Sequence, residues 1–232
     1  MTTDPQLPAL QHPLPEIAGP DGRRLHGGAQ NLLPRKSIRD SGCGLISSAN
    51  LLAYLTRFHG LNDGLFERIA QLDPIPLTEF NRACMRICRG FLRPLPHVGM
   101  TGTAVAFGLN REFRRRGIPY RASWCFRAGP MWERMAAMLQ QDLPVILAIG
   151  PNLPRFWRRH KLTLYRTRSD GSLRPAARTR AHFVTVTGMD DEWLAVSSWG
   201  HAFYINRAEF EEYARKYSSP WFSNILLLRE KA

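Results

Sequence analysis

The chain has 232 residues, of which 44% are hydrophobic and 22% charged, values ordinary for a folded globular protein. This composition excludes a coiled coil, a collagen-like chain and extensive disorder. The longest apolar run, Leu143 to Ile149, is interrupted by Pro144 and is far shorter than the roughly 20 residues of a membrane span. The first residues show no secretory signal, so we expect a cytoplasmic protein.

Lysine and arginine outnumber aspartate and glutamate, which gives a formal net charge of +13. Such a charge attracts nucleic acid, anionic surfaces or acidic substrates. No nucleic-acid motif accompanies it, so we expect a solvated basic surface and no nucleic-acid partner. Four cysteines are too few for a disulfide framework, and we expect them to be reduced thiols.

Helical patterns dominate the first part of the chain. Residues 1–25 contain five prolines and predict an extended arm, followed by a folded domain over residues 26–232. Apolar residues at three- and four-residue spacing, with start and stop signals, predict helices in that domain over 43–59, 62–72, 78–89, 103–116 and 130–141.

The second part of the chain changes character. One late helix is expected over 207–216. Short β-branched and aromatic runs predict strands over 120–126, 144–149, 162–166, 182–188, 193–198, 202–205 and 224–228. Helices that cluster early and strands that cluster late indicate an α+β fold with a mostly antiparallel sheet.

Cys43 lies between two glycines at the first turn of the strongest predicted helix. The positive end of a helix dipole favours a thiolate and lowers the pKa of a thiol. The flanking glycines leave the approach to the sulfur free of side chains. Cys43 is therefore a candidate nucleophile, and a small buried residue at a tight turn is the alternative.

His182 opens a predicted strand and is the candidate base. A turn at Asp190 and Asp191 would place His182 opposite Trp199, with Ser197 and Ser198 beside the imidazole. A cysteine at a helix start followed, more than 130 residues later, by a histidine on a strand is the order of a thiolate–imidazolium pair.

The segments DSGCGLISSANLLAYL and AHFVTVTGMDDEWLAVSSWG resemble the nucleophile helix and the histidine strand of papain-like cysteine peptidases. The closest similarity is to bacterial members like those that cut double-glycine leader peptides. The resemblance implies a papain-like fold, Cys43 as nucleophile, and His182 as base and later acid. It also implies a peptide or protein substrate, with no cofactor and no metal.

In that family an Asn or Asp orients the imidazole, and Ser197 occupies its place, with Asn206 as an alternative. Trp199 matches the tryptophan that covers this contact. The family also has a glutamine whose amide helps bind the oxyanion. Gln30 is the candidate, 13 residues before Cys43, and Asn31 is the runner-up.

Other titratable residues offer weaker candidates. Cys84 and Cys88 are four residues apart on one helix, where core thiols are favoured over metal ligands. Cys125 is expected in the core. His201 is the rival base.

The sequence leaves several functions open. A thiol-dependent hydrolase of peptide or amide bonds is favoured. The alternatives are a transglutaminase-like acyltransferase, a catalytically weak papain-like binding protein and a basic nucleic-acid-binding protein. The oligomeric state is left open as well.

Overall fold

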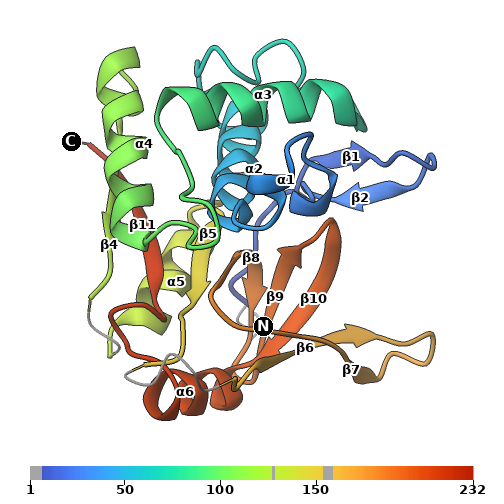
Figure 1. The fold of residues 1–232 in the computed structure, drawn as a ribbon, viewed down its shortest axis with the longest axis vertical. Coiled ribbons are helices and arrows are strands. Elements are labelled where there is room, and N and C mark those ends of the chain that lie inside the picture. Colours follow the sequence, from blue (N-terminus) through green and yellow to red (C-terminus); the bar gives the residue numbers. More distant parts are fainter. Residues whose placement is uncertain (1–6, 127–128, 154–158, 232) are drawn as a thin grey trace, which may run out of the picture.

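The computed structural model describes residues 7–126, 129–153 and 159–231 (Figure 1). Within these ranges the chain forms six α-helices and one short 3₁₀ helix, η1 (Gln30–Leu32). The α-helices are α1 (Lys36–Arg39), α2 (Cys43–Phe58), α3 (Leu77–Gly90), α4 (Gly102–Arg116), α5 (Met131–Gln140) and α6 (Arg207–Lys216).

An eight-stranded antiparallel sheet forms the centre of the molecule, in the order β4-β11-β5-β8-β9-β10-β6-β7. Its strands are β4 (Tyr120–Trp124), β5 (Val145–Ile149), β6 (Leu162–Thr167), β7 (Leu173–Thr179), β8 (His182–Met189), β9 (Trp193–Ser198), β10 (His201–Asn206) and β11 (Ile225–Glu230). A small second sheet has the order β2-β1-β3, with β1 (Glu16–Ala18), β2 (Arg24–His26) and β3 (Ile75–Pro76). The expected α+β class is confirmed.

Helices cover both faces of the large sheet. Helix α2 packs on β5 and β8 and α4 on β4 and β11, while α5 and α6 cover the other side (Figure 1). All five residues of β5 are buried, as expected for a strand with helices on both faces. The sequence of this strand is therefore continuously apolar and does not alternate between apolar and polar residues.

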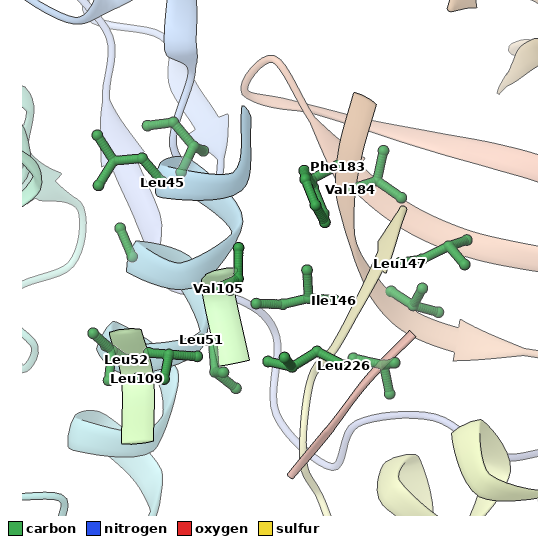
Figure 2. Close-up of a cluster of buried hydrophobic side chains, with 14 of the residues drawn as sticks. Leu45, Leu51, Leu52, Val105, Leu109, Ile146, Leu147, Phe183, Val184 and Leu226 are labelled. Atoms are coloured by element: carbon green, nitrogen blue, oxygen red, sulfur yellow. The ribbon is translucent and has the colours of Figure 1, made fainter. Parts of the chain in front are cut away.

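Helix α2 is the central element of the core. Thirteen of its sixteen residues are buried, so it is enclosed on all sides. In Figure 2, Ile146 of β5 and Leu226 of β11 point toward Val105 of α4 and Leu51 of α2. Burial of this kind contributes about 1.5–3 kcal/mol for each large apolar side chain.

Most of the predicted elements are confirmed, with ends that differ by a few residues. The expected helix over 62–72 is wrong, because the chain there forms turns. The carboxylate of Asp63 accepts the N–H groups of Leu65 and Phe66, at 2.8 and 2.9 Å. Such an acceptor competes with helical hydrogen bonding and favours a turn.

Strand β7 was not predicted from the sequence. It lies at the edge of the sheet, it contains Pro175, and most of its side chains are exposed. An edge strand tolerates proline because one row of its N–H groups needs no partner strand. Its sequence therefore lacks the alternation of apolar residues that identifies a buried strand.

The N-terminal arm is packed into the fold earlier than expected. Leu14 and Ile17 are buried, and β1 pairs with both β2 and β3. The described part of the arm therefore wraps against the fold and forms two short strands that prolines and local polarity concealed in the sequence. Residues 1–6 of the predicted arm lie outside the described residues.

A buried aspartate anchors this arm. The carboxylate of Asp142 accepts the hydroxyl of Tyr54 and the backbone N–H of Gln11, the latter at 2.7 Å. His12 Nδ1 lies 3.1 Å and His59 Nε2 3.4 Å from the same carboxylate. Burial acts to raise the pKa of Asp142, but these hydrogen bonds outweigh it and the pKa lies below its ordinary value.

We expect Tyr54→Phe to lower the free energy of unfolding by about 1–3 kcal/mol, because it removes a donor from a buried carboxylate. Urea unfolding at neutral pH measures the change. Tyr204→Phe is the matched control, since the hydroxyl of Tyr204 has no hydrogen-bond partner among the described residues. Equal stability of the two variants would show that Asp142 does not hold the arm through Tyr54.

Candidate functional site

Cys43 is the first residue of α2, and its side chain is partly exposed. The other three cysteines form no disulfide and are buried in the core. Gly44 allows α2 to approach the sheet closely, because a Cβ there would lie 3.0 Å from the Met100 side chain and 3.2 Å from the ring of Phe183. The nucleophile candidate is thus held where α2 meets β8.

Burial raises the pKa of the Cys43 thiol above its ordinary value. Hydrogen bonds from the backbone of Phe183, Gly44 and Cys43 itself act in the opposite direction and are outweighed. The lowered pKa expected from the helix start is therefore wrong for this structure. The helix start does supply N–H groups that stabilise the thiolate. Removal of water destabilises the thiolate by more than these hydrogen bonds stabilise it.

His182 is the first residue of β8 and is 7% exposed. Its Nε2 atom lies 2.8 Å from the hydroxyl oxygen of Ser198, and its ring stacks on Trp199 with centroids 4.5 Å apart. Burial lowers the pKa of His182 to about 3, so the imidazole is neutral at neutral pH. A neutral imidazole can accept a proton.

Cys43 lies against Phe183, the residue that follows His182 in β8. The pairing of β8 with β9 ends at Thr185 and Ser197, and the backbone of Phe183 beyond it meets the thiol. Among the hydrogen bonds of the described residues, none joins the sulfur of Cys43 to the imidazole, and none involves Nδ1 of His182. The structure thus places the thiol against the strand that begins at His182, and no hydrogen bond between the two side chains is present among the described residues.

The expected contact between Ser197 and His182 is wrong. The turn closes with Asp190 opposite Trp193, and an irregularity between Val186 and Gly188 shifts the register again. Ser197 therefore pairs with Thr185, which puts it on the opposite face of the sheet from His182. Ser198 takes its place beside the imidazole.

Ser197 has a different role. Its hydroxyl donates to the carbonyl oxygen of His26 at 2.5 Å, which ties β9 to the end of β2, where the following loop begins. Asn50 of α2 supports the same loop, because its Oδ1 accepts the N–H of Gly28 at 2.8 Å. Asn50 was missed in the sequence, although an amide within an otherwise apolar helix is a signal of a buried polar contact.

No hydrogen bond joins Gln30 to Cys43 among the described residues. The amide Nε2 of Gln30 donates to the carbonyl oxygen of Arg39 at 2.9 Å, so the chain doubles back as expected but stops four residues short of the cysteine. Asn31, the alternative to Gln30, lines a cavity beside Trp199. Asn206 caps α6, because its side-chain oxygen accepts the N–H of Glu209 at 3.1 Å. This oxygen is therefore engaged in the helix cap.

His201, the rival base, lines the same cavity as Asn31. Its ring packs edge-on against Phe203, with centroids 6.2 Å apart. In the described part of the chain no three metal-binding side chains cluster together. Across the same residues, every helix is too short or too polar to cross a bilayer.

Comparison with protein families finds no matching family, and comparison with curated proteins finds no relative.

Ser198→Ala should move the side-chain resonances of His182, because it removes the partner of Nε2. We also expect a loss of about 1–3 kcal/mol in the free energy of unfolding, the usual cost of a buried group without its partner. Nitrogen NMR of labelled histidine and urea unfolding measure the two effects. Ser197→Ala is the matched control and should leave the His182 resonances in place. The reverse result would return the orienting role to Ser197.

Alkylation of Cys43 by iodoacetamide should accelerate with pH, with a midpoint above the ordinary thiol pKa of 9.0. The thiolate is the reactive form, so a raised pKa leaves less of it at neutral pH and shifts the profile upward. Mass spectrometry of the Cys43 peptide follows this thiol separately from the others. A midpoint well below 9.0 would mean that the helix start and His182 outweigh burial.

Proposed function

We propose that the protein is a thiol-dependent hydrolase that cleaves peptide or amide bonds, with Cys43 as nucleophile and His182 as base. One observation carries the proposal: the thiol at the start of α2 lies against the backbone of Phe183, the residue that follows His182, and the imidazole of His182 is held by Ser198 and Trp199. A nucleophile, a base and a group that orients the base are the parts such a reaction needs.

In the proposed reaction both groups start uncharged. The raised pKa of the Cys43 thiol and the lowered pKa of His182 favour the neutral thiol and neutral imidazole over an ion pair. As the sulfur bonds to the substrate carbonyl carbon, the thiol proton passes to His182. His182 then gives this proton to the leaving amine, and water cleaves the resulting thioester.

Backbone N–H groups are the proposed oxyanion donors. The N–H groups at the start of α2 have no partner within the helix, and those of Cys43 and Gly44 reach the thiol. Negative charge that develops on the carbonyl oxygen of a bound substrate would lie beside them. Gln30 would have to leave the carbonyl of Arg39 before its amide could take part.

The resemblance to papain-like peptidases supports a peptide or protein substrate. The four cysteines form no disulfide, which fits a reducing compartment, and we propose the cytoplasm as the location. Neither point depends on the geometry of the site.

A papain-like binding protein without catalysis is the second candidate. The strongly lowered pKa of His182 favours it, because an imidazole that resists protonation is a weak base. Ser198 adds to this, since a hydroxyl stabilises imidazolium less than a carboxylate does.

Acylation by p-nitrophenyl acetate separates the two candidates. We expect one equivalent of p-nitrophenol in a burst, with an acetyl group on Cys43 found by mass spectrometry. His182→Ala should slow the burst by about 10²–10⁴-fold, the usual contribution of general-base catalysis. Cys43→Ala should abolish it, while Cys88→Ala, a buried thiol outside the site, should retain it. A burst that is absent, or unaffected by His182→Ala, would favour the binding protein.

A further inference from the structure

A cavity of about 430 Å³ opens beside Trp199, between the β2 segment, the region of η1 and the turn from β9 to β10. Its lining combines three arginines and a histidine with apolar side chains. The residues that matter for its chemistry are Arg23, Arg24, Leu25, Arg166, Trp199 and His201.

Two of the three arginines are paired with carboxylates. Arg23 forms an ion pair with Asp21, the one acidic residue of the lining. Arg24 lies 2.6 Å from a carboxylate oxygen of Glu16 and 3.3 Å from one of Asp73. These two cations are therefore largely balanced by the protein itself.

Arg166 is different. No carboxylate among the described residues pairs with it. Its guanidinium carbon instead lies 5.0 Å from the centre of the Phe203 ring, which positions the group without neutralising it. A guanidinium held in this way presents several N–H donors in a planar arrangement suited to a carboxylate.

His201 lies within the electrostatic influence of two of these arginines. Burial lowers the pKa of His201, and the charges of Arg166 and Arg23 lower it further. The histidine is thus disposed to remain neutral, and the same field that opposes its protonation favours an anion in the cavity.

Trp199 connects the cavity to the candidate active site. Its ring stacks on His182, and the same side chain lines the cavity. Leu25 adds apolar surface beside it. A ligand with a flat apolar body could pack here while its charge reaches Arg166.

We propose that this cavity binds an aromatic carboxylate, with the carboxylate on Arg166 and the ring against Trp199 and Leu25. The inference does not depend on the reactivity of Cys43, because it concerns binding alone. The same chemistry is present in a free aromatic acid and in a peptide that ends in an aromatic residue.

NMR titration with benzoate tests the proposal. We expect benzoate to shift the ring resonances of His201 and the indole N–H of Trp199, while the uncharged benzamide leaves them in place. Arg166→Gln should weaken benzoate binding about tenfold or more, the loss expected for a hydrogen-bonded charge pair. Arg166→Lys should bind more tightly than Arg166→Gln, since it keeps the charge.

Arg178→Gln is the matched control, because it removes the same charge from β7, the strand next to β6. It should bind benzoate like the unaltered protein. If Arg166→Gln and Arg178→Gln weaken benzoate binding equally, the effect comes from net charge alone, and the proposal is overturned. Absence of benzoate shifts, or equal binding of benzamide, would overturn it too.

N-acetylphenylalanine and its amide distinguish the two sources of the ligand. Tighter binding of N-acetylphenylalanine than of benzoate, lost in the amide, would identify a peptide C-terminus as the occupant. Tighter binding of benzoate would identify a free aromatic acid. Failure of both carboxylates to bind would overturn the proposal, whatever the outcome of the Cys43 acylation experiment.

Discussion

The enclosure of α2 between the large sheet and the helices around it is the constraint on which the rest of the structure depends. Because thirteen of its sixteen residues are buried, neither its axis nor its rotation can change without opening the core. Gly44 brings its first turn to within contact of Phe183, and Asn50 fixes the loop after β2 from its middle. The position of Cys43 is therefore set by packing along the whole helix.

The same enclosure determines the chemistry of the site. Water is removed from both Cys43 and His182, which raises the pKa of the thiol and lowers that of the imidazole. The charged pair loses stability on both sides, so the neutral thiol and the neutral imidazole are favoured, and the reaction we propose starts from this uncharged pair. The same burial strengthens the hydrogen bonds of the site, because water competes weakly there and the dielectric constant is low.

Trp199 belongs both to the candidate active site, through His182, and to the cavity that contains Arg166. It follows β9 with a positive φ of 50°, a conformation that few non-glycine residues adopt. This turn away from the sheet lets its ring stack on His182 while its side chain also lines the cavity of Arg166. The proposed anion site and the proposed active site are thus in contact through one indole.

The sequence by itself determined α2, most of the other helices and strands, the α+β class, and Cys43 and His182 as the candidate site residues, because these follow from local periodicity and residue chemistry. Tertiary structure alone decided that Ser198 and not Ser197 contacts His182, since an irregularity in the β8–β9 pairing changes which face each side chain occupies. It also decided that Gln30 binds the carbonyl of Arg39 and that burial outweighs the helix start in setting the pKa of Cys43. Register, long-range hydrogen bonds and desolvation depend on segments distant in sequence, and local patterns carry no information about them.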